Sequence, residues 1–187
     1  MRVASLLAGV AFVLAIAPGV DAVACGNEVE MRLTPVQQIA SAENELANGR
    51  IGEAASRVRA GFPQIRTLGA DAPPLALRAE RIYALALVRA DGHLDSGLGW
   101  ARSGNLEWAI ETLRALDAKR PNDPRSQADL AEARSRVPRT RAEAITVLEA
   151  LDQRDLLGSA FAYLALSAPA QPQATMAEHK PRSAAAP

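Results

Sequence analysis

The stretch GNLEWAIETLRALDAKRPNDP, residues 104–124, decides how the chain is interpreted. Gly104 and Asn105 open it, and Pro121 and Pro124 close it. Between these breaks apolar residues recur every three or four positions, which is typical of one face of an amphipathic helix. The stretch is therefore either an ordinary helix or one unit of a repeat, and the rest of the chain distinguishes the two.

A second copy of the pattern lies 35 residues further along the chain. AIETLRALDAK (109–119) and AITVLEALDQR (144–154) are identical at six of eleven positions. A fainter copy lies 55 residues before the first, with Ile51, Ala54 and Val58 at the equivalent positions. A period near 35 residues, with helical spacing inside each copy, indicates stacked helix hairpins.

Residues 104–124 resemble the second half of a tetratricopeptide repeat. The resemblance places Gly104 at the turn between paired helices, Ala109 where two helices cross closely, Leu113 in the core and Pro121 at the end of the unit. The characteristic aromatic residues of the family's first helix are absent. The resemblance implies a degenerate, all-α short solenoid of stacked antiparallel hairpins, and such solenoids usually bind peptides or proteins on a concave surface.

Signals for helix ends independently predict the first hairpin. Thr34-Pro35-Val36-Gln37 is a capping box with proline at the first helical position, and Asn48-Gly49 is a stop signal. The apolar stripe of this helix is predicted to contain Val36, Ile39, Ala40, Leu46 and Ala47. The facing stripe of its partner is predicted to contain Ile51, Ala54, Ala55, Val58, Phe62 and Ile65.

Later signals bring the predicted total to six or seven helices over residues 34–168, with no strand. Pro73-Pro74 and Asp123-Pro124 each predict a helix start. The run IYALALV (82–88) is apolar throughout, so that helix is expected to be buried on several sides. The last apolar stripe is predicted to contain Leu157, Ala160, Phe161 and Leu164.

The first 24 residues have the layout of a secretory signal peptide. Arg2 gives a positive start, Val3–Ala17 is an uncharged apolar run, and small residues follow Pro18-Gly19 at two potential cleavage sites. The run is shorter than the roughly 20 residues that a membrane-spanning helix needs. We therefore expect residues 1–24 to be removed and the protein to be secreted or periplasmic.

Cleavage after Ala24 would place Cys25, the single cysteine, at the new N-terminus. Ala22-Val23-Ala24-Cys25 resembles a bacterial lipoprotein box, in which the cysteine receives lipid. Ala22 stands where that box usually has leucine, and Asp21 puts a charge where its apolar core continues. The alternatives are a free thiol or an intermolecular disulfide. A lipid-anchored structural component of the bacterial envelope, held through Cys25, is thus an alternative to a freely exported binding protein.

Composition and motifs favour a non-enzymatic protein. Lys+Arg and Asp+Glu number 21 each, so no net charge favours nucleic acid or an anionic membrane. The chain has no glycine-rich phosphate loop and no G-x-S-x-G motif, and neither of its histidines, His93 and His179, has an evident orienting partner for catalysis. We expect no catalytic residue, no metal and no cofactor, and a protein or peptide as the partner.

Two segments retain alternative interpretations. Residues 91–104 contain four glycines and Trp100, so they form either a contact loop or a loop whose tryptophan folds back onto the helices. In the same segment Asp91, Asp95 and Ser96 could contact a calcium ion, although no calcium-loop template matches.

Four arginines, Arg134, Arg136, Arg139 and Arg141, flank Pro138. They indicate either a solvated turn between helices or a site for a protein carboxylate or an anionic envelope lipid. The two ends of the domain are simpler: residues 25–33 are a short N-terminal extension. The Pro/Ala-rich residues 169–187 are expected to be disordered, because they cannot bury a core.

Overall fold

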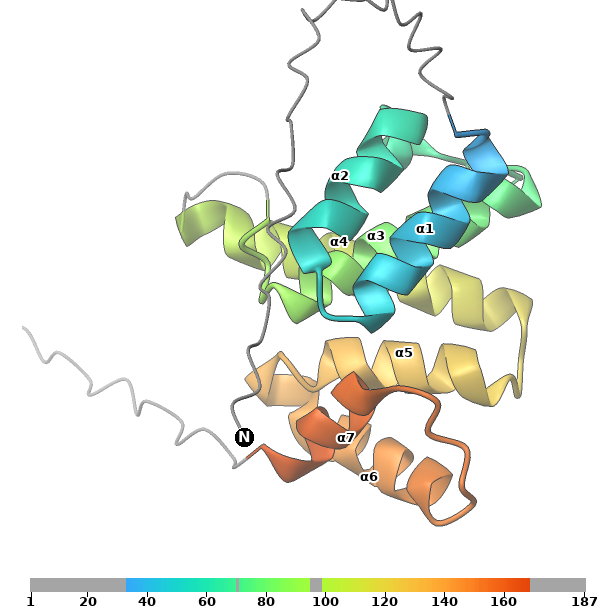
Figure 1. Cartoon of the computed structure of the whole chain (residues 1–187). Helices are drawn as coiled ribbons and strands as arrows, with labels where there is room; N and C mark the ends of the chain where they lie inside the picture. The colour runs from blue at the N-terminus through green and yellow to red at the C-terminus, as the bar shows by residue number, and fades with distance from the viewer. Residues whose placement is uncertain (1–32, 70, 95–98, 169–187) are drawn as a thin grey trace, which may run out of the picture. The chain divides into compact units, whose positions relative to one another are not determined.

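The computed structural model describes residues 33–168, except 70 and 95–98 (Figure 1). This part of the chain is all-α, as predicted, and no strand occurs within it. Its α-helices are α1 (Pro35–Ala47), α2 (Ile51–Gly61), α3 (Pro74–Arg89), α4 (Gly99–Lys119), α5 (Pro124–Arg134), α6 (Arg141–Asp152) and α7 (Ala160–Ser167), and its short 3-10 helices are η1 (Ile65–Thr67) and η2 (Pro138–Thr140).

Several sequence predictions fall outside the described residues. The signal peptide (1–24), Cys25 and the tail (169–187) with its histidine are among them, as is the side chain of Trp100. They stay predictions. None of the helices described here is long and apolar enough to cross a membrane.

The predicted helix starts are confirmed. Prolines occupy the first turn of α1, α3 and α5, where a fixed φ and a missing N–H do no harm. The capping box is complete: the backbone N–H of Gln37 donates to Thr34 Oγ1 at 3.3 Å, and the Thr34 N–H donates to Gln37 Oε1 at 2.9 Å. At α5, Asp123 Oδ1 accepts from the Arg125 N–H at 3.1 Å.

The helices pack in an alternating pattern. Each α-helix contacts the one before it, and the odd-numbered helices also contact one another in order, α1 with α3, α3 with α5 and α5 with α7. Figure 1 shows α1 and α2 side by side, joined by a short turn, and Gly49 lies between the two helices in the sequence. That glycine has φ +77°, a left-handed conformation that residues with a side chain rarely adopt. Because α1 contacts α3, α3 contacts α5 and α5 contacts α7, the odd-numbered helices form a row.

The larger hydrophobic cluster involves α1 to α4. Every residue of the run 82–88 is buried, as its sequence predicted, because α1, α2, α4 and α5 all pack against α3. Tyr83 meets Trp108 of α4 edge to face, with 5.7 Å between ring centroids. Ile39, Val58 and Leu113 supply the opposing surfaces from α1, α2 and α4.

The smaller hydrophobic cluster involves α5, α6, α7 and the connection before α7. It contains five alanines and three leucines: Ala128, Ala131, Ala144, Leu148, Leu151, Leu157, Ala162 and Ala165. Ala144 and Leu148 are fully buried, as are their counterparts Ala109 and Leu113 in the larger cluster. The repeated positions therefore serve the same purpose in α4 and α6, which is burial against neighbouring helices.

Parts of two predicted stripes are wrong. In α1, Val36, Ala40 and Ala47 are exposed, whereas Ala42 and Glu45 are buried. The buried Glu45 carboxylate is bound by Arg57 of α2, with Nε–Oε1 at 2.9 Å and Nη2–Oε1 at 2.6 Å. Such a partner allows a carboxylate to lie at a buried position, and a search for apolar periodicity does not detect that position.

The last predicted stripe is partly correct, because Leu157 is buried in the smaller cluster. Leu157 lies before α7, Ala160 is exposed, Phe161 is partly buried and Leu164 is 58% exposed. The buried positions of α7 are alanines, Ala162 and Ala165. Small side chains at these positions allow the short helix to approach its neighbours closely, whereas Tyr163 and Leu164 are exposed.

The predicted turn at Gly104 is also wrong, because α4 runs through it from Gly99 without interruption. The left-handed glycine that follows α3 is Gly92, with φ +78°, and a Cβ there would lie 2.6 Å from the carbonyl oxygen of Arg102. Asn105, 4% exposed, donates to the Gly92 carbonyl at 2.8 Å and accepts from Arg66. These tertiary contacts offset the cost of about 1 kcal/mol for glycine inside a helix.

Candidate functional site

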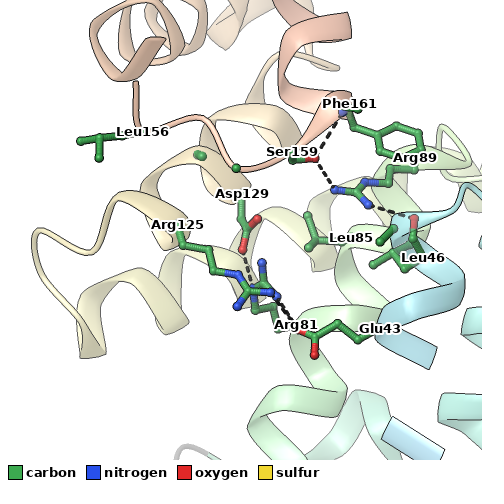
Figure 2. Close-up of a pocket in the computed structure, with 14 residues that line it drawn as sticks. Glu43, Leu46, Arg81, Leu85, Arg89, Arg125, Asp129, Leu156, Ser159 and Phe161 are labelled. Carbon is green, nitrogen blue, oxygen red and sulfur yellow. Dashed lines mark hydrogen bonds and ion pairs between the residues drawn. The ribbon is translucent and has the colours of Figure 1, made fainter. Parts of the chain in front are cut away.

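The row of odd-numbered helices carries a cavity of about 310 Å³ between α1, α3, α5 and the start of α7 (Figure 2). Its apolar lining includes Leu46 and Leu85. Its charged and aromatic lining consists of Glu43, Arg81, Arg89, Arg125, Asp129 and Phe161. The cavity is therefore defined by alternate helices and has a highly charged wall.

Arg89 ties four helices together at one end of this cavity. Its Nε and Nη2 bind the two carboxylate oxygens of Glu132 at 2.9 and 3.1 Å, and the two side chains are only 6% and 1% exposed. Nη2 also donates to Ser159 Oγ at 3.1 Å, and Nη1 donates to the Leu46 carbonyl at 3.3 Å. The Phe161 ring lies over the guanidinium, 4.1 Å away, as Figure 2 shows. These contacts give Arg89 an architectural role.

Glu43 is surrounded by three arginines near the other end. Arg125 Nη2 lies 2.8 Å from Glu43 Oε1, and Arg81 Nη1 lies 3.5 Å from the same oxygen. Arg78 binds the second oxygen through Nε at 3.1 Å and also through Nη2. Arg81 in turn binds Asp129 Oδ2 through Nε at 2.5 Å. Figure 2 shows Arg81 and Arg125 converging on Glu43.

The pKa values of Glu43 and Asp129 are shifted in opposite directions by burial and by neighbouring charges. Partial burial raises the pKa of Glu43, but the hydrogen bonds and charges of Arg78 and Arg125 outweigh it, so the net pKa is lowered. For Asp129 burial dominates, and its pKa is raised although Arg81 opposes the shift. Glu43 is therefore held as a carboxylate at neutral pH.

A second cavity of about 460 Å³ adjoins the first. The two share Glu43, Arg81 and Arg125 in their walls. The second adds Arg78 of α3, with Lys119, Arg120 and Asp123 from the end of α4 and the connection to α5. The arginine–glutamate cluster, which consists of Glu43, Arg78, Arg81 and Arg125, therefore lies where the two cavities meet.

The structure describes only some of the candidate calcium and histidine positions. His93 is exposed, and Asp91 binds Arg102, with three oxygen–nitrogen distances between 2.8 and 3.0 Å. Asp95 and Ser96 lie outside the described residues. Over the ranges that are described, no group of three histidine, cysteine, aspartate or glutamate side chains is placed to hold a metal ion.

The four-arginine segment lies apart from these two cavities, around η2 between α5 and α6. Arg134 faces Glu143 at 3.7 Å. Arg141 donates to two carbonyl oxygens, of Ser135 at 3.0 Å and of Ala168 at 2.7 Å. Both arginines therefore bind groups of this chain.

The sequence analysis named some residues of the two cavities, such as Leu46, Phe161 and Asp123, but only as stripe or cap residues and not as a functional site. The paired charges are 35 residues apart for Arg78 with Glu43 and 82 apart for Arg125 with Glu43, so neither pair follows from local spacing. One signal was present: Arg78, Arg81 and Arg89 are three and eight residues apart, which places them along one face of a helix. That spacing predicts a charged stripe without predicting its partners.

No protein-family model, no curated protein and no solved structure matches this chain. The features that bear on function are therefore the row of helices and its two cavities.

Proposed function

We propose that this chain is an exported, non-enzymatic helical-repeat protein, similar to a degenerate tetratricopeptide-repeat solenoid. It binds a peptide or protein segment along the face formed by α1, α3, α5 and α7. It uses no cofactor and does not bind nucleic acid. The binding face would be the one that stacked hairpins generally present to ligands.

One observation carries this proposal: alternate helices contact one another in order, and two adjoining cavities lie on that same row. A row of this kind can hold an elongated ligand across several helices, whereas a compact active site would need convergent groups at one point. The side chains that converge here are mainly arginines. Their guanidinium groups donate hydrogen bonds but do not release protons in proteins, so they suit recognition better than acid–base catalysis.

The sequence of the first 25 residues supports the proposal of export. The alternative, a structural component anchored through lipid on Cys25, makes a different prediction for the mature N-terminus. Mass analysis of protein recovered from cells would give an acyl mass on Cys25 under the anchored alternative. An unmodified chain beginning near Cys25 would support free export, and a chain beginning at Met1 would contradict both.

A pair of photocrosslinking positions tests the binding face. Ala47 lines the first cavity and is exposed, whereas Ala150 is an exposed position of α6 outside the cavities described above. With a photoreactive residue at each position in turn, an extract of the source cells should give discrete adducts from position 47 and none of the same mass from position 150. Identical adducts from both positions, or none from position 47, would contradict the proposed face.

A further inference from the structure

Resting on the proposed function, we propose further that the bound segment is acidic and extended. In this account the Glu43 carboxylate occupies the place that one carboxylate of the ligand would take among the arginines.

The arginines around Glu43 have more hydrogen-bond donors than its carboxylate can accept. Each guanidinium has five N–H donors, whereas one carboxylate has about four acceptor positions. Arg78 and Arg125 both bind Glu43, yet their side chains are 44% and 64% exposed, and that of Glu43 is 26% exposed. Donors beyond those used by Glu43 are therefore accessible to a ligand, in the geometry that binds carboxylates.

The second cavity has an excess of basic side chains. Its lining includes five basic side chains and two acidic ones: Arg78, Arg81, Lys119, Arg120 and Arg125 against Glu43 and Asp123. Asp129 balances Arg81 from the neighbouring cavity, and Lys119 interacts with Glu80. Three basic groups, Arg78, Arg120 and Arg125, then face two acidic ones, Glu43 and Asp123. Asp123 already accepts a hydrogen bond from the backbone at the start of α5. A local excess of positive charge in a chain of zero net charge favours an acidic partner.

The two adjoining cavities favour an elongated ligand. The two cavities have Glu43, Arg81 and Arg125 in common, so a segment that fills both must cross the arginine–glutamate cluster. A small anion would engage one group of donors and leave the hollows on either side unfilled. Both cavities fall in or near the range of roughly 300–1,000 Å³ that is typical of ligand sites. An extended peptide uses the whole surface.

The test measures binding of a fluorescent hexaglutamate peptide with an amidated C-terminus, so that only side-chain carboxylates are examined. The full-length chain is kept in a non-ionic detergent because of its apolar start. We expect saturable binding of hexaglutamate and none of hexalysine. The double substitution Arg78→Gln/Arg125→Gln should weaken binding about tenfold or more, since it removes two charge-assisted hydrogen-bonding groups. Glu43→Gln should strengthen binding, because it removes the competing carboxylate.

Two further variants keep the test decisive. Arg114→Gln removes an arginine of α4 that pairs with Glu111 outside the cavities, and it should leave the affinity unchanged. The Arg114 side chain is 51% exposed, which lies between the values for Arg78 and Arg125. Arg120→Gln alters an exposed residue of the second cavity outside the Glu43 cluster, and it should weaken binding about two- to threefold even if the double variant fails to fold. Far-UV circular dichroism and melting establish which variants are folded.

Three results would overturn the inference: no binding of hexaglutamate, equal effects of Arg114→Gln and Arg120→Gln, or displacement of hexaglutamate by an equal concentration of inorganic phosphate. The last would identify a free-anion site. Failure here is distinguishable from failure of the proposed function. If position 47 crosslinks a segment without acidic residues while hexaglutamate does not bind, the binding face stands and its acidic specificity falls.

Discussion

The two hydrophobic clusters of this molecule differ in the size of their buried side chains and in the interactions that stabilise them. The cluster of α1 to α4 is built around α3, with Tyr83, leucine, isoleucine and valine side chains buried on consecutive turns. The cluster of α5 to α7 contains only alanine and leucine among its buried residues. Helix α5 belongs to both, since Ala133 packs into the first and Ala128 into the second.

The difference shows where each part of the fold obtains its stability. Burial of apolar surface contributes about 25 cal/mol per Å², so the alanine-rich cluster gains less per residue than the first. Helix α5 carries two buried carboxylates, Asp129 and Glu132, which bind Arg81 and Arg89 of α3. These ion pairs, together with the packing of α5 against α4, connect the C-terminal helices to the first cluster.

The largest effect is expected from breaking the more deeply buried pair. Arg89→Ala leaves the Glu132 carboxylate buried without its partner and should lower the free energy of unfolding by about 3–5 kcal/mol. Denaturant titration measures the loss. Arg114→Ala, which removes an exposed pair on α4, should cost less than about 0.5 kcal/mol. Equal midpoints for the two variants would mean that the buried pair does not hold the clusters together.

A matched pair of leucines sharpens the comparison. Leu113→Ala in the first cluster and Leu148→Ala in the second remove equivalent, fully buried side chains, and each should cost about 2–5 kcal/mol. Amide hydrogen exchange should separate them. In Leu148→Ala the amides of α6 and α7 should exchange faster by a larger factor than those of α3, because the second cluster opens locally. Uniform acceleration along the chain would indicate a single cooperative unit instead.

The sequence predicted the helices best where the backbone itself is constrained. Proline at the first turn, the capping box at Thr34 and the aspartate before α5 act within four residues, so their effect can be read locally. The run 82–88 was equally informative, because uninterrupted apolar character leaves no exposed face. Ala109, Leu113 and their counterparts 35 residues later were also correctly assigned to buried positions.

The rest depends on partners that are distant in sequence. Gly104 and Asn105 form a turn signal by local rules, yet Asn105 is held in a helix by Arg66 and Gly92. The arginine–glutamate cluster joins α1, α3 and α5, and only the folded arrangement brings those helices together. A single amphipathic pattern predicts that a face is charged but leaves its partners undetermined.

A further prediction uses pH to isolate the ion pair that links α1 to α2. Hydrogen bonds from Arg57 lower the pKa of Glu45 despite its burial. A lowered folded-state pKa means that the pair stabilises the fold above the ordinary glutamate pKa, and that this contribution is lost as the pH falls through the lowered value. Glu45→Gln should therefore cost about 1.5–3 kcal/mol at pH 7.

The difference between Glu45→Gln and the parent should shrink toward zero as the pH falls below the lowered pKa. Denaturant titrations of both proteins across the acidic range measure it. Arg114→Gln is the control, and its small effect should change little over the same range because that pair is exposed. A difference that stays constant with pH would show that Glu45 acts through packing and not through its charge.

The equivalence of α4 and α6 is central to the proposed helical repeat, whereas the row of odd-numbered helices is observed independently in their contacts. Ala109 and Ala144 are both fully buried, one in each cluster, whereas Ala118 of α4 is exposed. A larger side chain at either buried alanine must push helices apart, which typically costs about 1–3 kcal/mol. Chemical denaturation of Ala109→Leu, Ala144→Leu and Ala118→Leu measures this directly. The account predicts lower midpoints for the first two and an almost unchanged midpoint for the third; equal midpoints for Ala109→Leu and Ala118→Leu would contradict it.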